Sequence, residues 1–369
     1  MAKKVAYITR HTVSNYGSLL QTYATQKAIE KLGYEAVCIN YWREDELLPN
    51  LSKTLLQTSR WNKNLLTRLL YMVTQRPVFT AALKKFENFR KPMLKLTERE
   101  YHTVDQLQDN LPLADVYMTG SDQTWNTITK NEVDPAYFLS FVPDDKKKIA
   151  YAASFGTGSV KQEDRLKIKS WLKRYDSISI REDSGVKIAE SMGVKAQQVL
   201  DPTFLLEPEE WIQLLPERVP DEKYVLVYQL HPSKAFDEYA KEFSKRKKLK
   251  LLRIHPYFHH IAKNGKFIYC PSPEEFLWYI HNAEYFITDS FHGTAFAIGL
   301  NTQFINILPK MTSERIESIL NVVGLQNRVL KCFDDFGIAD IQIDFSEVNR
   351  KIRQERMRSL EVLKQMIEE

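Results

Sequence analysis

The sequence predicts an α/β protein built from two doubly wound domains that face each other across a cleft, and three observations support this fold class. Short apolar runs rich in strand formers alternate with segments of helical period along most of the chain. The 369 residues exceed what one typical core accommodates. A charged stretch at 206–222, with three prolines, separates two such sets and is the expected linker.

The first domain, residues 1–205, opens with a strand, a polar turn, a helix and a second strand. Residues 19–32 place apolar side chains at helical spacing, and Gly33 stands where a helix C-cap is expected. Short runs of strand formers then recur between helical segments, which is typical of a parallel sheet. The predicted strands are 5–9, 35–41, 114–119, 148–152, 177–180 and 197–200, and the predicted helices are 19–32, 162–174 and 183–192.

Residues from about 50 to 100 interrupt this alternation. They contain no glycine, and leucine, lysine, arginine and phenylalanine recur at helical spacing, so we expect a helical insertion. Its basic residues form either a solvated helix face, which is the commoner arrangement, or a surface patch. They are Lys53, Arg60, Lys63, Arg68, Arg76, Lys84, Lys85, Arg90, Lys91 and Lys95.

The second domain, residues 223–345, repeats the alternation of strands and helices. A charged amphipathic helix is expected after it, at 346–369. The predicted strands are 224–228, 250–254, 285–288 and 304–307, and the predicted helices are 233–248, 273–282, 293–300 and 312–321.

Composition narrows the classes of function. The chain has 52 basic and 47 acidic residues, and this small excess gives weak support for an anionic ligand and none for nucleic acid. Its three cysteines are far apart and form no CxxC pair, so we expect neither a disulfide scaffold nor a metal cluster. No signal peptide and no apolar run of about 18 residues is found, which favours a cytoplasmic protein with at most peripheral membrane contact.

Ligands of open α/β sheets bind at the carboxyl ends of strands, so the loops that follow strands are the places to search. The segment 288–294 carries Ser290, His292 and Gly293 where a strand ends and a helix should begin near Gly293. A histidine there can protonate a substrate or hold a phosphate, and the first helical turn can bind an anion. The alternative is a histidine that caps the helix or bonds a backbone carbonyl.

Three further loops follow strands in the first domain. Asp122 is either an acid or base or the N-cap of the next turn. The turn 14–18 offers asparagine, glycine and serine to a phosphate or a sugar, although it matches neither GxxxxGK[ST] nor GxGxxG. Arg181 either clamps a carboxylate or phosphate or pairs with Glu182 or Asp183. His231 follows a strand of the second domain, and no HExxH or comparable spacing suggests a metal site.

Six segments, in order and suitably spaced over roughly residues 5–330, resemble the polysaccharide pyruvyl transferase family. The helical insertion and the C-terminal helix lie outside this pattern. The segments are NYGSLLQTYATQKAIEKLGYE at 15–35, TGSDQTWN at 119–126, YAASFG at 151–156, SIREDSG at 179–185, VLDPTFLL at 199–206 and ITDSFHGTAFAIGLNTQFI at 287–305.

The resemblance implies two Rossmann-like domains similar to GT-B glycosyltransferases, with phosphoenolpyruvate as co-substrate and no cofactor or metal. The implied reaction forms a pyruvate ketal on two hydroxyls of a sugar or lipid-linked glycan and releases phosphate. Some members have arginine-leucine where this chain has Ser290-Phe291, so one donor-binding arginine is missing or is replaced by Arg315 or Lys310. The implied catalytic residues are His292 and Asp122, the donor-binding residues are Arg181, Ser290, Gly293, Thr294, Arg315 and Lys310, and the acceptor-binding residues are Asn15, Tyr16, Gly17, Ser18 and Gln123.

Two other functions remain open from the sequence. A nucleotide-sugar-dependent glycosyltransferase would use the same two domains, because a fold does not determine a function. A non-catalytic sugar-binding protein would use the basic insertion for docking. Under the pyruvyl transferase interpretation, alanine at His292 or Arg181 should abolish turnover without unfolding the protein.

Overall fold

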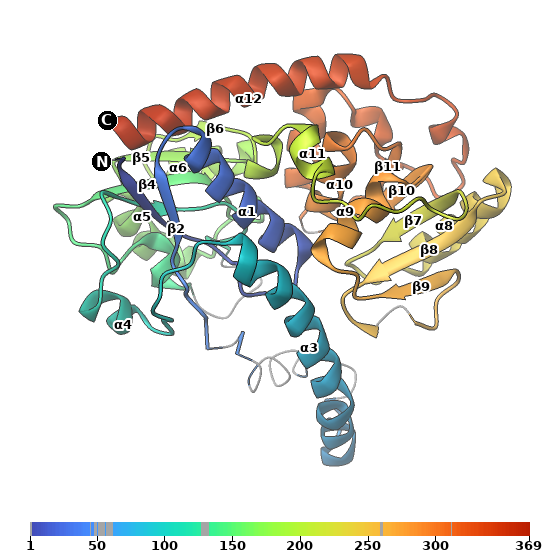
Figure 1. The fold of residues 1–369 in the computed structure, drawn as a ribbon, viewed down its shortest axis with the longest axis horizontal. Helices are drawn as coiled ribbons and strands as arrows, with labels where there is room; N and C mark the ends of the chain where they lie inside the picture. The colour runs from blue at the N-terminus through green and yellow to red at the C-terminus, as the bar shows by residue number, and fades with distance from the viewer. Residues whose placement is uncertain are drawn as a thin grey trace.

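The computed structural model describes residues 2–44, 46–47, 50, 56, 62–126, 133–258, 261–310 and 312–369. It contains two parallel sheets, each with helices packed against it (Figure 1). This is the predicted α/β class with two Rossmann-like units. The strands of the first sheet lie within residues 4–198, and those of the second lie within residues 224–306.

The first sheet has the order β2-β1-β3-β4-β5-β6, and all of its pairs are parallel. Apolar residues fill both faces of its central strands, because helices cover the sheet on both sides. The chain order reverses at β1, which lies between β2 and β3. The strands are β1 (Lys4–Ile8), β2 (Glu35–Cys38), β3 (Val116–Thr119), β4 (Lys147–Ala153), β5 (Ser177–Ile180) and β6 (Gln197–Gln198).

The second sheet has the order β11-β10-β7-β8-β9 and is also parallel throughout. The sequence did not predict β9, a four-residue edge strand whose side chains are only partly buried, so no continuous apolar run reveals it. The strands are β7 (Tyr224–Tyr228), β8 (Lys250–His255), β9 (Lys266–Tyr269), β10 (Tyr285–Thr288) and β11 (Phe304–Asn306).

Most helices follow the predicted segments with small shifts at their ends, whereas the short helices α4 (Val104–Asp109) and α7 (Pro208–Ile212) were not predicted. Two shifts affect the site: α1 begins at Tyr16 and not at Leu19, and α10 begins at Phe291 and not near Gly293, because Ser290 is its N-cap and accepts the Gly293 N–H at 3.2 Å. The helices are α1 (Tyr16–Lys31), α3 (Leu65–Met93), α4 (Val104–Asp109), α5 (Arg165–Leu172), α6 (Asp183–Ser191), α7 (Pro208–Ile212), α8 (Lys234–Lys247), α9 (Pro273–His281), α10 (Phe291–Gly299), α11 (Glu314–Val323) and α12 (Phe345–Glu368).

Two helices join the two halves of the molecule. Apolar residues of α1, among them Leu19 and Leu20, share one core with residues of α9 and α10. The last helix, α12, runs back across the molecule and packs Leu363 and Ile367 against the first sheet, so the two chain ends lie close together (Figure 1). The expected C-terminal helix is therefore part of the first sheet's core.

The expected helical insertion corresponds largely to α3, whose N-terminal turns protrude from the body (Figure 1). Residues 51–55 and 57–61 of that insertion lie outside the described part of the chain. Within the expected linker at 206–222, the structure has the short helix α7, which buries Trp211.

Candidate functional site

The chain-order reversals of both sheets open onto one cavity of about 310 Å³. Asn15 and Ser18 follow β1 and Asp122 follows β3, while His231 and Asp289 follow β7 and β10. Such a reversal leaves a crevice at the carboxyl ends of the strands, where ligands of open α/β sheets bind. The other lining residues that matter below are Arg10, Gln123, Ser290, Phe291, His292 and Arg315.

The N-termini of α1 and α10 meet at this cavity. A Cβ on Gly17 would lie 2.2 Å from Cγ and Nδ1 of His292, so only glycine allows the His292 ring to pack against α1 here. Asn15 caps α1 by accepting the Ser18 N–H at 3.2 Å, and Ser290 caps α10. The N–H groups of each first turn lack a partner within their helix and carry the positive end of its dipole, so both ends favour an anion.

Arg181 lies behind His292, at the end of β5, and is surrounded by three carboxylates. Its Nη1 is 2.7 Å from Asp201 Oδ2, its Nη2 is 3.6 Å from Asp122 Oδ1, and its Nε is 3.6 Å from Glu182 Oε2. The Arg181 side chain is 1% exposed, and the carboxylate side chains are 6% exposed or less. Phe291 covers the guanidinium with its ring centroid 4.5 Å away. Arg181 therefore organises an anionic cluster in the wall of the cavity.

The charges of this cluster shift one another's pKa values. Burial opposes ionisation of Asp122, but Arg181 and then His292 lower its pKa well below the usual range of an aspartate. For Arg181, burial is likewise outweighed by Asp201 and Asp122, so its pKa is raised. Burial raises the pKa of Glu182. Asp122 is thus a weak base, and this argues against the predicted role of a hydroxyl-activating base.

Asp122 instead ties the two halves of the β1–β3 crevice together. Its Oδ2 accepts the Ser18 hydroxyl at 2.5 Å and its Oδ1 accepts the Gln123 N–H at 2.8 Å. Its φ of 78° lies in the left-handed region, which is uncommon for a residue other than glycine. The backbone strain is held by this buried network.

His292 is neutral at physiological pH. Burial, opposed by Asp201 and assisted by Arg181, lowers its pKa to about 4. Its Nε2 lies 3.8 Å from Asp201 Oδ2 and 3.5 Å from Arg181 Nη1. The binding of an anion beside the ring would favour its protonated form.

Arg315 is the buried cation that lines the cavity itself. No carboxylate of the described residues lies within ion-pair distance of its guanidinium, and burial, followed by repulsion from Arg181, lowers its pKa to about 10. The Gln123 amide, with its oxygen turned toward Arg315, accepts from the terminal nitrogens at 3.0 and 3.2 Å. Arg10 also lines the cavity, but its Nη2 is paired with Glu46 at 2.6 Å. Arg315 is thus a charged donor at neutral pH that makes no ion-pair contact within the described part of the chain.

Of the predicted donor-binding residues, Arg181 does not line this cavity and is paired with Asp201 in the buried cluster behind it. Ser290 and Arg315 line the cavity. Gly293 is held against Thr288, and the Thr294 hydroxyl accepts from Asn306 at 2.7 Å, so both residues join α10 to its sheet. Lys310 is exposed and does not line this cavity, which follows from its place in the loop before α11.

Among the predicted acceptor-binding residues, Asn15, Ser18 and Gln123 line the cavity and Gly17 supports His292. Tyr16 points away from the cavity. Its ring stacks on Phe276 with centroids 4.3 Å apart, and its hydroxyl donates to Pro271 O at 2.9 Å. The structure therefore gives Tyr16 a packing role between α1 and the second half of the chain.

The sequence reasoning missed two carboxylates of the site. Asp201, the third residue of the segment at 199–206, bridges Arg181, Ser121 at 2.9 Å and Thr203. Asp289 accepts the backbone N–H of His231 at 2.8 Å and lies 3.1 Å from its Nδ1. Asp289 directly follows β10, and Asp201 lies shortly after β6. Their positions after strands could have indicated both residues.

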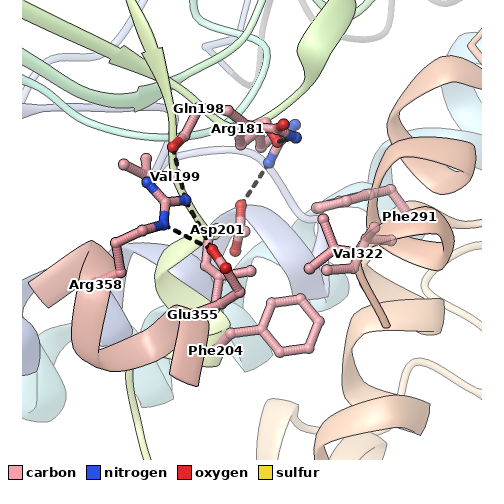
Figure 2. Close-up of a pocket in the computed structure, with 11 residues that line it drawn as sticks. Arg181, Gln198, Val199, Asp201, Phe204, Phe291, Val322, Glu355 and Arg358 are labelled. Carbon is pink, nitrogen blue, oxygen red and sulfur yellow. Dashed lines mark hydrogen bonds and ion pairs between the residues drawn. The ribbon is translucent and has the colours of Figure 1, made fainter. Parts of the chain in front are cut away.

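A second cavity, of about 320 Å³, lies against Arg181 and Phe291 (Figure 2). It is closed by α12, whose Arg358 donates to Gln198 O at 2.9 Å and to Glu355 at 2.8 Å (Figure 2). Ser359, next along α12, accepts the Leu200 N–H at 3.0 Å. The C-terminal helix thus fixes the backbone that presents Asp201 to Arg181.

The described residues contain no group of three or more histidine, cysteine, aspartate or glutamate side chains arranged to hold a metal ion. What the site offers a ligand is two helix N-termini, one unpaired guanidinium and two histidines. This set suits a small anion that carries phosphate or carboxylate groups.

Comparisons with known proteins identify the family and the fold of the chain. The family model for polysaccharide pyruvyl transferase matches residues 15–310. No curated protein matches the chain. Solved structures share the fold at low identity, which supports a GT-B-like architecture and no more.

Three of these structures show the extent of the likeness. Trehalose-6-phosphate synthase OtsA has a TM-score of 0.56 at 9% identity, with 100% of this chain and 99% of that one covered. MnaA of S. aureus, solved with UDP, has a TM-score of 0.52 at 11% identity, covering 95% and 87%. UDP-GlcNAc 2-epimerase from Neisseria meningitidis has a TM-score of 0.50 at 11% identity, covering 100% and 94%.

Proposed function

The chain belongs to the polysaccharide pyruvyl transferase family, and from this premise we propose that it transfers the pyruvyl group of phosphoenolpyruvate to two hydroxyls of a glycan as a ketal. The observation that carries the proposal is the cavity where the N-termini of α1 and α10 face the unpaired Arg315. Phosphoenolpyruvate is small and carries a phosphate and a carboxylate. Two helix dipoles and a guanidinium are suited to bind both groups.

The proposed reaction balances in protons and bonds. Protonation of the donor methylene carbon makes the adjacent carbon oxocarbenium-like, and one sugar hydroxyl adds to it. The bond to the bridging oxygen then breaks, phosphate leaves, and the second hydroxyl forms the ketal. One hydroxyl proton ends in the new methyl group and the other on phosphate. Cationic groups and helix N-termini stabilise the leaving phosphate.

We assign the methylene proton to His292 and the acceptance of the hydroxyl proton to His231. His292 lies between the two helix N-termini, where a bound dianion would raise its pKa from about 4. His231 is half exposed at the edge of the cavity. Its Nδ1 lies 3.1 Å from Asp289 Oδ2, so its Nε2 is the ring nitrogen that accepts the proton in this assignment. Asp122 is a weaker candidate because Arg181 and the Ser18 hydroxyl stabilise its charge.

Methionine at Arg315 should raise the Kd for phosphoenolpyruvate by about 10- to 100-fold, because a charge-assisted contact is lost. The measurement is calorimetry together with phosphate release in the presence of a panel of glycans. Lys310→Met is the matched control: it removes a nearby exposed cation that does not line the cavity, and should leave the Kd unchanged.

The donor assignment has a clear opposing result. UDP in place of phosphoenolpyruvate should give no thermal stabilisation of the wild-type protein, whereas a nucleotide-sugar transferase would be stabilised by it. Stabilisation by UDP alone, or unchanged donor affinity in Arg315→Met, would contradict the proposal.

Glutamine at His231 should lower kcat by about 10²- to 10⁴-fold, the usual contribution of a positioned proton acceptor, with little effect on the donor Kd. Because this side chain is half exposed, the substitution should leave the protein folded, and circular dichroism checks this. His281→Gln at the end of α9 is the control and should leave kcat unchanged. Equal rates for wild type and His231→Gln would remove His231 from the mechanism.

A further inference from the structure

The protruding start of α3 exposes a row of large apolar side chains, which we call the α3 tip face. Its members are 49–77% exposed, far more than residues of a core. Five of the large exposed apolar residues of the described chain fall within residues 65–73. A cluster of this kind marks an interaction surface. The tip face consists of Leu65, Leu66, Leu69, Leu70 and Val73.

The spacing of these residues places them on one side of the helix. Positions i, i+1, i+4, i+5 and i+8 lie within a single stripe at 100° per residue. The side chains that α3 buries against the body, such as Tyr71, Ala82 and Phe86, fall on the opposite side. The tip face therefore lies on the side of α3 opposite to its buried residues. Figure 1 shows that this end of the helix protrudes from the body.

The longer segment that contains the tip face, between Glu46 and Glu87, accounts for the net positive charge of the chain. Between Glu46 and Glu87 there is no acidic residue, and there are seven basic ones. The rest of the chain has 45 basic and 47 acidic residues, so the excess of +5 comes from this segment alone. Arg76 and Lys84 are exposed and lie on the same side of α3 as the tip face, one and several turns farther along.

We propose that the α3 tip face docks on an anionic lipid surface. Leucine and valine side chains enter the boundary between headgroups and acyl chains, and the arginines and lysines beside them bind lipid phosphates. A surface that binds a protein partner would be expected to carry acidic as well as basic residues. The segment between Glu46 and Glu87 contains no acidic residue. No described helix is long and apolar enough to cross a membrane, so α3 would lie on the surface.

The attachment of α3 connects such docking to the cavity. Near its far end, Phe86 packs on Tyr16 with ring centroids 4.9 Å apart, and Gln26 donates to Met93 O at 3.1 Å. Both partners belong to α1, whose N-terminus opens onto the cavity. Docking through the tip face would therefore hold the cavity at a set orientation to the lipid surface, whatever reaction takes place there.

Vesicle flotation of the full chain tests the proposal. The wild type should bind vesicles of phosphatidylcholine with phosphatidylglycerol, and binding should weaken about tenfold or more at high salt or without the anionic lipid. L66Q/L69Q/V73Q should lose at least about tenfold in binding, because it removes apolar contact area and leaves every charge in place. R68Q/R76Q should shift the loss of binding to lower salt.

The matched control is L113Q/L166Q/I341Q, which changes three strongly exposed apolar residues elsewhere and should bind as the wild type does. Circular dichroism should give unchanged melting temperatures for all variants. Failure of the wild type to bind anionic vesicles, or full binding by L66Q/L69Q/V73Q, overturns the proposal. The proposal is also overturned if the wild type is a dimer and L66Q/L69Q/V73Q is a monomer, because a second copy of the chain would then cover the tip face.

Discussion

Replacing Arg181 with methionine should destabilise the protein by about 3–5 kcal/mol, the cost of removing one partner from a buried ion pair. Asp122, Glu182 and Asp201 would then share a buried space without their common cation. The raised pKa of Arg181 has the same sign, because it means that the folded state favours the charged side chain. Urea unfolding monitored by circular dichroism measures the change.

Arg315→Met is the contrasting variant, because both arginines are buried beside the Phe291 ring. The pKa of Arg315 is lowered, so its charge is disfavoured by the fold, and its removal should leave stability unchanged or increase it. The pair separates the stability role of Arg181 from the ligand role of Arg315. Equal destabilisation by the two variants would show that lost packing, and not charge, is responsible.

A double variant tests the charge argument directly. Arg181→Met combined with Asp201→Asn should be more stable than Arg181→Met alone, because one of the unpaired carboxylates is removed. Asp201→Asn in the wild-type background should be destabilising, since Asp201 also accepts from Ser121 and Thr203. The sequence alone led us to expect that alanine at Arg181 would leave the protein folded, and the unfolding measurements on these variants test that expectation against the buried ion pairs.

Much of the fold was predictable because its signals are local. The buried strands are continuous runs of strand formers, and Ser290 and His292 line the cavity because residues that follow strands lie at one edge of a sheet. The pairing of Arg181 with its neighbour Glu182 was among the alternatives predicted, but Asp122 and Asp201 were not predictable as its partners, because they come from other strands and only the folded chain brings them within reach. The spacing of residues along the sequence does not predict which distant carboxylates will contact an arginine.

Tyr16 shows the same limit in another way. In the sequence it stands between Asn15 and Gly17, two residues of the site, and its hydroxyl suits a sugar. Its stacking on Phe276 depends on a contact between residues far apart in the chain, which apolar periodicity does not reveal. A polar residue beside a site is therefore assigned safely only once the direction of its side chain is known.

Asparagine at His292 should lower kcat by about 10²- to 10⁴-fold if this ring supplies the methylene proton. Its pKa of about 4 means that the free protein holds it neutral at pH 7, so its protonation must accompany binding of the donor. Calorimetry in two buffers of different ionisation enthalpy should therefore show proton uptake on binding phosphoenolpyruvate. The uptake should be smaller in His292→Asn by the share that belongs to this ring, and identical uptake in the two proteins would exclude the assignment.

Gly17→Ala should reproduce most of this loss without touching His292 itself. The new Cβ would lie 2.2 Å from the ring, so the ring must move, and a shift of about 1 Å in a reacting group can cost about 10²-fold in rate. The double variant with His292→Asn should be no slower than His292→Asn alone, because Gly17 acts only through the ring. Gly299→Ala, at the other end of α10 with no atom within 4 Å of its Cβ, is the matched control and should keep wild-type kcat. A wild-type kcat for Gly17→Ala would mean that the His292 ring can be displaced without loss of rate. A group that protonates phosphoenolpyruvate could not be displaced in this way, so this result would contradict the assignment.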